Sequence, residues 1–132
     1  TFMAFFDKHL VLFEPHFMRN FIHVRDVCKA FILSLDNFSS MKNETYNVGL
    51  SNCNISKLEL CKEIQRQIPD FQYTISKTGK DPDKRNYMIS NKKIEAKGFK
   101  PDFSLQEGIS ELIKGFQIIR KSRCKNIKYD NK

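Results

Sequence analysis

The sequence predicts an α/β fold in which strands and helices alternate along one chain. Three observations favour this fold class. Short apolar or alternating runs, typical of strands, recur between longer segments whose apolar residues have helical spacing. Two helix starts carry a capping box, Ser56 with Glu59 and Ser104 with Glu107. The 132 residues, 40% of them hydrophobic, suffice for one compact core but not for two ordinary domains.

The first half of the chain predicts three short strands. Residues 1–9 are apolar and aromatic without a clear period. A short apolar run predicts a buried strand at 10–13, ended by Glu14 and Pro15. Further strands are predicted at 21–24 and at 45–48, the latter closed by Gly49. The polar residues 37–43 are expected to form a loop before the third of these strands.

One helix, from Asp26 to about Leu35, is expected to be buried on most sides. Asp26 can cap its first turn, because a carboxylate accepts a hydrogen bond from an orphan backbone amide there. Apolar residues occupy nearly every face of the helix, and such a helix must lie between two layers. The chain itself offers little to cover it on both sides.

The second half predicts one strand among three helices. Ile55 and Leu60 occupy the hydrophobic-staple positions of the helix that begins at Ser56, and Pro69 ends that helix. The other elements expected are a strand at 71–75, a short helix at 90–97 stopped by Gly98, and a final helix after Ser104.

The net charge of +8 is concentrated at one end of the chain. Residues 120–132 contain six Lys and Arg against the single acidic residue Asp130, and the rest is close to balance. A basic polar segment without apolar periodicity predicts a disordered tail after a single unit at 1–119, so nucleic acid is not the expected partner. No apolar run approaches the ~18–20 residues of a membrane span, and no membrane association is expected.

The four cysteines are spaced like isolated thiols. Cys28, Cys53, Cys61 and Cys124 form no C-x-x-C pair and have no His at metal-ligand spacing. We therefore expect neither a metal site nor a disulfide framework. Reduced thiols are typical of a cytoplasmic protein, which is the localisation that we expect.

The sequence offers no catalytic residue and no cofactor motif. Tyr73 and Lys77 match Y-x-x-x-K, a spacing that works when both residues share a helix face. The alternation at 71–75 predicts a strand instead, where four residues span roughly 13 Å and the ammonium would not reach the phenol. The five glycines form no G-x-x-G-x-x-G or G-x-G-x-x-G turn, so this chain alone is not expected to bind NAD. His23 is interpreted as a hydrogen-bonded structural residue rather than a general base.

Arg19 and Arg85 are the candidates for ligand binding. A guanidinium offers a planar fork of donors that suits phosphate oxygens and stays charged at any working pH. Arg19 follows a loop at the edge of a predicted strand, and Arg85 lies in the polar segment 79–87 ahead of a short helix. For either residue alone, a surface salt bridge is the commoner role.

Five ordered blocks between Leu10 and Arg120 carry a family resemblance. They are Arg19–Val27, Tyr46–Gly49, Ser56–Leu60, the run from Asp83 to Ile94, and Gly98–Ile109. In this order and spacing they resemble the NAD-dependent epimerase/dehydratase family, extended short-chain dehydrogenases that act on nucleotide-diphosphate sugars. In one departure from the family pattern, residues 14–18 replace the Gly-rich turn of many members. The identity of the nucleotide base that the chain would bind is therefore left open.

The resemblance implies the C-terminal substrate-binding portion of such an enzyme, with the nucleotide-binding Rossmann core missing. The missing part would bind NAD(P) and supply the Tyr base with its Lys partner, so we expect this chain to be inactive alone. By position, Arg19 and Arg85 would bind the diphosphate of the nucleotide sugar. The backbone around Val11, Leu12 and Phe13 would lie near the base. The parent enzyme is expected to be a homodimer.

Two other functions stay open. The chain as a stand-alone nucleic-acid-binding domain would use the basic tail and the aromatic residues, although it has no recognised DNA- or RNA-binding signature. Salt-dependent binding to an oligonucleotide would favour that function. A structural partner that docks on a separate Rossmann subunit is the third hypothesis, and co-purification of such a subunit would favour it.

Overall fold

The computed structural model describes residues 1–79, 83 and 85–121. Its elements in chain order are α1 (Phe2–Phe6), β1 (His9–Leu12), β2 (Met18–Asn20), α2 (Val24–Asp36), α3 (Phe38–Met41), β3 (Asn54–Ser56), α4 (Lys57–Gln67), β4 (Gln72–Ile75), α5 (Lys92–Glu95) and α6 (Leu105–Lys121). The predicted α/β class is confirmed. The tail predicted at 120–132 starts inside α6, and its residues from 122 on, Cys124 included, lie outside the described part of the chain.

Two small sheets join segments that are distant in sequence. β1 and β4 are parallel, with His9 opposite Gln72. β2 and β3 are antiparallel, with Arg19 opposite Ile55. Parallel strands need a crossover connection, and here the crossover contains β2, α2, α3, β3 and α4.

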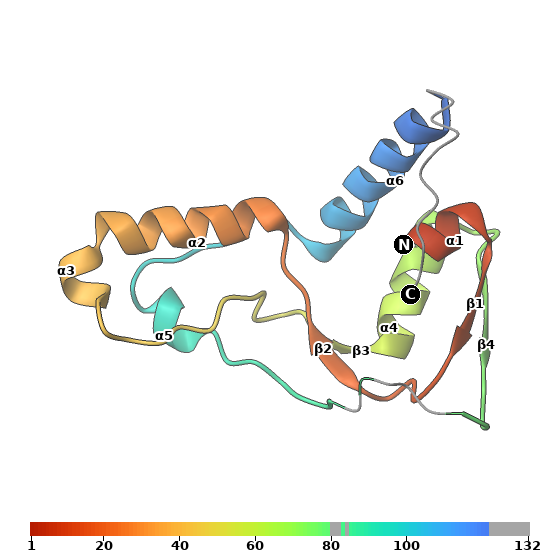
Figure 1. Cartoon of the computed structure of the whole chain (residues 1–132), viewed down its shortest axis with the longest axis horizontal. Helices are drawn as coiled ribbons and strands as arrows, with labels where there is room; N and C mark the ends of the chain where they lie inside the picture. The colour runs from red at the N-terminus through yellow and green to blue at the C-terminus, as the bar shows by residue number, and fades with distance from the viewer. Residues whose placement is uncertain (80–82, 84, 122–132) are drawn as a thin grey trace.

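The molecule has two regions, each with its own core. Figure 1 shows α1, α4 and α6 gathered beside β1 and β4, whereas α2, α3 and α5 extend away from them. We call these groups the sheet lobe and the helical arm. Among the described residues, the core of the sheet lobe consists of Ala4, Phe5, Leu12, Cys61, Ile64, Ile68, Phe71 and Ile109, and that of the arm of Ala30, Met41, Ile94 and Phe99.

Both predicted capping boxes are confirmed in the sheet lobe. The Ser56 hydroxyl accepts a hydrogen bond from the Glu59 amide at 3.2 Å, and the Glu59 carboxylate accepts one from the Ser56 amide at 2.7 Å. Ser104 and Glu107 repeat this geometry before α6. The serine amides hold the pKa of each glutamate below its usual value. These local hydrogen bonds satisfy amides that the first turns of α4 and α6 leave unpaired.

The predicted strand at 21–24 and the predicted cap at Asp26 are wrong. The strand ends earlier, at Asn20, and α2 begins at Val24 with His23 as its N-cap. The Asp26 side chain is fully buried and accepts hydrogen bonds from the amides of Asp102 at 2.8 Å and Phe103 at 3.1 Å. Asp26 thus binds the chain segment before α6 and does not cap the start of its own helix.

The segment at 45–48 also differs from its prediction. Among the described residues it pairs with no strand. Its partly buried side chains Tyr46 and Val48 pack against the core of the arm. The loop expected at 37–43 contains the short helix α3, which buries Met41. The strands at 10–13 and 71–75 are confirmed as β1 and β4, whereas the helix expected at 90–97 is only the four residues of α5.

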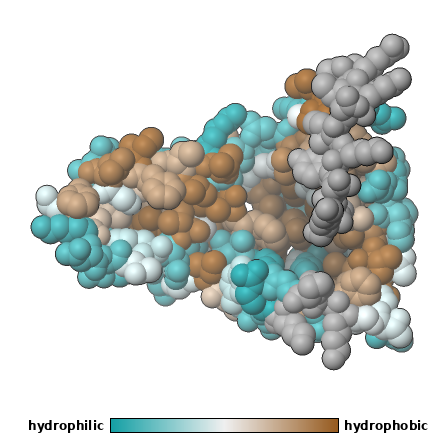
Figure 2. Space-filling model, in the orientation of Figure 1, coloured by the Kyte–Doolittle hydropathy of each residue, from teal (hydrophilic) through white to brown (hydrophobic). Residues whose placement is uncertain are grey.

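Helix α2 is covered on one side only. Ala30 is buried in the core of the arm, but Phe31 is 69% exposed and Leu35 is 72% exposed. Figure 2 shows hydrophobic residues spread over the arm, where α2 and α3 lie. The expectation that the chain offers little to cover this helix on both sides agrees with these exposures among the described residues. None of the described helices combines the length and apolarity that crossing a membrane requires.

Candidate functional site

Arg19 lies in β2 with its guanidinium fixed by backbone carbonyl groups. Its Nη1 donates to the Met18 carbonyl at 2.8 Å and to the carbonyl of Arg85, and its Nη2 donates to the Asp83 carbonyl at 3.3 Å. The Tyr87 ring lies 5.4 Å from the guanidinium carbon, within range of a cation–π contact. Only 13% of the side chain is exposed, so this charge has a defined position next to solvent.

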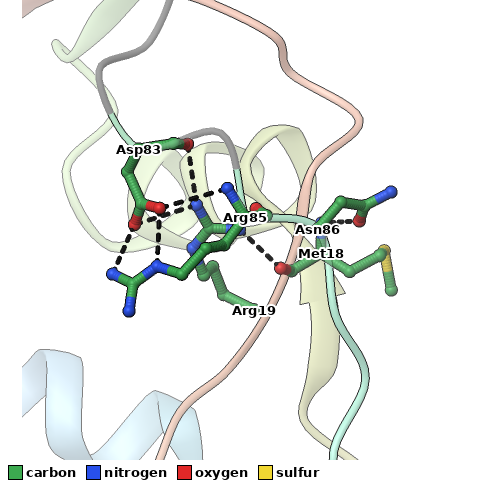
Figure 3. A network of polar contacts seen from close by, with 5 residues as sticks. All are labelled: Met18, Arg19, Asp83, Arg85 and Asn86. Atoms are coloured by element: carbon green, nitrogen blue, oxygen red, sulfur yellow. Dashed lines mark hydrogen bonds and ion pairs between the residues drawn. The ribbon is translucent and has the colours of Figure 1, made fainter.

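Arg85 lies beside Arg19, on the chain segment between β4 and α5. Its side chain is 73% exposed. Its Nε donates to Asp83 Oδ1 at 2.7 Å and its Nη2 to Asp83 Oδ2 at 2.8 Å, a two-pronged pairing. The structure therefore brings together the two arginines that the sequence analysis selected (Figure 3).

Asp83 joins the two arginines. Its Oδ2 also lies 3.2 Å from Arg19 Nη2, so one carboxylate faces both guanidiniums. Hydrogen bonds from the Arg85 side chain hold the pKa of Asp83 well below its usual range, and Asp83 raises the pKa of Arg85. The cluster of Arg19, Asp83 and Arg85, which we call the arginine pair site, carries two positive charges against one negative charge. It can attract an anion but contains no group suited to proton transfer.

Asparagine side chains hold the segments around the arginine pair site. Asn86 Oδ1 accepts a hydrogen bond from the Met18 amide at 2.9 Å. Asn54 exchanges two hydrogen bonds with the backbone of Ile89, both at 2.9 Å. Asn20 bonds the Leu50 carbonyl at 2.7 Å and the Leu50 amide at 3.1 Å. These contacts attach the chain before β3 and the chain after residue 85 to β2 and β3, and the sequence analysis did not identify them.

Gly49 shows how closely this region is packed. A Cβ atom at Gly49 would lie 2.0 Å from Asn20 Oδ1, so any side chain there would displace the Asn20 amide. In the sequence, the only sign of this close approach of Asn20 to Gly49 is that Gly49 ends the block Tyr46–Gly49.

Two known proteins with related sequences are named as synthases of nucleotide-linked sugars. Over 100 residues the chain is 31% identical to a probable GDP-L-fucose synthase of Oryza sativa subsp. japonica, which covers 75% of this chain and 29% of that protein. Over 102 residues it is 29% identical to CDP-abequose synthase of Salmonella typhimurium, which covers 74% of this chain and 34% of that protein. No protein-family model matches the chain.

Solved structures agree on the fold. A dTDP-glucose 4,6-dehydratase from Bacillus anthracis, in complex with NAD, has a TM-score of 0.65 and 22% identity over 91% of this chain and 38% of that one. A UDP-glucose 4-epimerase of Thermus thermophilus, also in complex with NAD, has a TM-score of 0.63 and 20% identity over 82% of this chain and 35% of that one.

This chain is a relative of the NAD-dependent epimerases and dehydratases. It spans about a third of the length of the relatives that it matches. The resemblance inferred from the five sequence blocks is thereby confirmed.

The other predicted substrate residues lie on β1 or directly after it, away from the strand pair that carries Arg19. Leu12 is buried in the core of the sheet lobe, and its carbonyl accepts a hydrogen bond from the Ser76 amide at 3.1 Å. Val11 is exposed on β1. Phe13 packs against Gly79, where a Cβ atom would lie 2.7 Å from the ring. A role for this backbone beside a nucleotide base stays a prediction.

Tyr73 and His23, which the sequence analysis considered and rejected as catalytic residues, have structural surroundings. Tyr73 lies on β4, as the alternation predicted, and packs against the core of the sheet lobe. His23 Nε2 lies 2.5 Å from Glu111 Oε2, its Nδ1 accepts a hydrogen bond from the Arg25 amide, and its ring stacks on Phe103. The prediction that His23 is hydrogen-bonded is confirmed, because both ring nitrogens have partners.

No metal centre emerges from the described residues, which contain no cluster of three or more His, Cys, Asp or Glu that could hold an ion. Cys28, Cys53 and Cys61 are free thiols. Burial raises the pKa of Cys53 and of Cys61, so these two side chains stay protonated and unreactive at neutral pH.

Proposed function

We propose that the chain is the substrate-binding portion of an NAD-dependent nucleotide-sugar epimerase or dehydratase. In this proposal Arg19 and Arg85 bind the diphosphate of a nucleotide sugar. The relatives named above carry GDP-, CDP-, dTDP- and UDP-linked sugars in their names, and all of these ligands share a diphosphate. A diphosphate is therefore the part of the ligand that is common to the group.

One observation carries the proposal. Arg19 and Arg85 are far apart in sequence, yet both meet Asp83 at one exposed point. Paired guanidiniums suit the several acceptor oxygens of a diphosphate better than a lone arginine does. Arg19 would supply a fixed charge and Arg85 a more adaptable one, because their exposed fractions are 13% and 73%.

The open side of α2 supports the second half of the proposal, that another portion completes the enzyme. Phe31, Ile32 and Leu35 form a large apolar surface that a layer of protein would remove from water. We infer that this layer is a nucleotide-binding portion, which would bind NAD(P) and supply the catalytic Tyr and Lys. The described chain alone is then inactive, and the completed enzyme is a cytoplasmic homodimer.

Binding measurements on the folded chain test the diphosphate site. We expect GDP, CDP, dTDP or UDP to shift the backbone NMR signals of β2 and of the segment around Arg85, with weak affinity. Arg19→Ala is expected to weaken this binding about tenfold or more, because a hydrogen bond to a charged group contributes roughly 1.5–3 kcal/mol.

Arg66→Ala is the matched control. The Arg66 side chain is 73% exposed, like that of Arg85, but it pairs with Glu63 on α4. Its loss should leave nucleotide binding unchanged. A folded sample whose spectrum responds to none of the four nucleotides, or an Arg19→Ala variant that binds like the wild type, would contradict the proposal.

A further inference from the structure

Asp83 occupies the donors that a diphosphate would use. Its carboxylate oxygens lie 2.7 Å from Arg85 Nε, 2.8 Å from Arg85 Nη2 and 3.2 Å from Arg19 Nη2 (Figure 3). One edge of a guanidinium fork pairs with one carboxylate or one phosphate at a time. An anion that binds these nitrogens must therefore replace the Asp83 carboxylate.

Arg19 keeps its position without that carboxylate. The carbonyl groups of Met18, Asp83 and Arg85 accept its hydrogen bonds, and Tyr87 lies beside its guanidinium. The removal of the Asp83 charge would thus free a donor of Arg19 without releasing its side chain.

Arg85 depends on Asp83 much more. Its guanidinium hydrogen bonds, among the described residues, are to Asp83, and most of its side chain is exposed. An exposed ion pair of this kind contributes little to stability, so it can exchange for another anion at small cost.

We propose that Asp83 is an internal counter-ion that closes the arginine pair site until a ligand with more than one negative charge displaces it. This inference rests on the proposed function, because it concerns the same two arginines. A monoanion would only substitute for Asp83, one charge for one. A diphosphate brings more charge and more acceptor oxygens to both guanidiniums, so it alone gains from the exchange.

The titration of Asp83 supports this role. The pKa of its carboxyl group is held well below the usual range by Arg85, so Asp83 stays ionised at neutral and mildly acidic pH. The competition between Asp83 and a ligand therefore persists under physiological conditions. Because most of the Arg85 side chain is exposed, added salt should weaken both its pair with Asp83 and a bound anion.

Titration of inorganic pyrophosphate and acetate into four forms of the full chain tests the proposal. The forms are the wild type, Asp83→Asn, Asp83→Glu and Asp70→Asn, followed by NMR at low salt. Asp83→Asn is expected to bind pyrophosphate roughly three- to tenfold more tightly than the wild type and to gain measurable acetate binding. Asp83→Glu keeps the charge and should bind like the wild type.

Asp70→Asn controls for net charge. Asp70 pairs with Lys8 at 3.0 Å in the sheet lobe, so this variant loses one negative charge away from the arginine pair site. An equal gain in Asp70→Asn, or unchanged or weaker binding in Asp83→Asn, would overturn the counter-ion role. If Arg19→Ala still weakens pyrophosphate binding about tenfold or more in that case, the proposed function stands. Absence of pyrophosphate binding in every form would overturn both.

Discussion

The sheet lobe and the helical arm are stabilised in different ways. The lobe encloses its core between α1, α4, α6 and the parallel strands, and Phe71 within it is almost fully buried. The arm encloses a smaller core and leaves Phe31, Ile32, Leu35 and Phe38 exposed. Because apolar burial is the main favourable term in folding, the lobe has the larger share of the stability of this chain.

Polar contacts join the elements of the arm to one another and to the segment before α6. Lys29 pairs with Asp102 at 2.6 Å, Lys93 pairs with Glu44 at 2.7 Å, and Lys97 donates to the Ser40 carbonyl at 2.9 Å. The buried Asp26 adds two charge-assisted hydrogen bonds. The polar contacts of Lys29 and Asp26 thus fix the position of α2, whereas the apolar residues on its other side stay exposed in the described chain.

The largest effect is expected from a deletion in the core of the lobe. Phe71→Ala should lower the free energy of unfolding by about 3–5 kcal/mol, because it leaves a cavity in a closed core. Phe31→Ala in the arm should change it by less than about 0.5 kcal/mol, since that ring is already exposed. Urea unfolding followed by circular dichroism measures both, and equal losses would show that the arm is enclosed in solution.

The next largest effect is expected where the arm meets the segment before α6. Asp26→Ala should cost roughly 2–4 kcal/mol, because two backbone amides lose a charged acceptor in a buried place. Asp36→Ala, at the exposed end of the same helix, is the control and should be close to neutral. A neutral result for Asp26→Ala would mean that water reaches the amides of Asp102 and Phe103.

The smallest effect concerns the capping boxes of the lobe under acid conditions. The folded-state pKa values of Glu59 and Glu107 are lowered, so their stabilisation is complete above the unfolded value of about 4.3 and disappears as the pH falls through the folded values. We expect the urea midpoint to be steady from about pH 7 to pH 5 and to fall below about pH 4.

A double variant tests the cause of this acid sensitivity. Glu59→Gln with Glu107→Gln should flatten the fall below pH 4, whereas Glu63→Gln, which removes a partner of Arg66 but no helix cap, should not. An unchanged pH profile in the double variant would assign the acid sensitivity to other carboxylates.

Local signals predicted the lobe better than the arm. Capping boxes involve residues three positions apart, so Ser56 with Glu59 and Ser104 with Glu107 could be identified from the sequence. The hydrogen bonds of Asp26 could not be identified in this way, because their donors follow it by more than 70 positions. Its place near a helix start suggested a nearer backbone amide instead. The residues at 45–48 predict a strand, but they could not show that the described part of the chain places no strand beside them.

The sequence predicted the two arginines of the candidate site but not the hydrogen bonds and ion pairs that hold them. Residue type and family blocks selected Arg19 and Arg85. The role of Asp83 depends on the path of its loop, and that of Asn54 and Asn86 on backbone groups far away in sequence. An asparagine or aspartate in a polar loop is common in any surface segment, so its sequence gives no signal of such a partner.

The pairing of β1 with β4 has a consequence for how this chain can change. Of the arm, α2 and α3 lie within the crossover between these two strands, whereas α5 follows β4. The entropy of closing such a loop grows only with the logarithm of its length, so a doubling costs about 0.6 kcal/mol. Insertions and deletions around α2 and α3 are therefore expected to leave the pairing of β1 with β4 almost unaffected, so this part of the arm can change length while the lobe keeps its register.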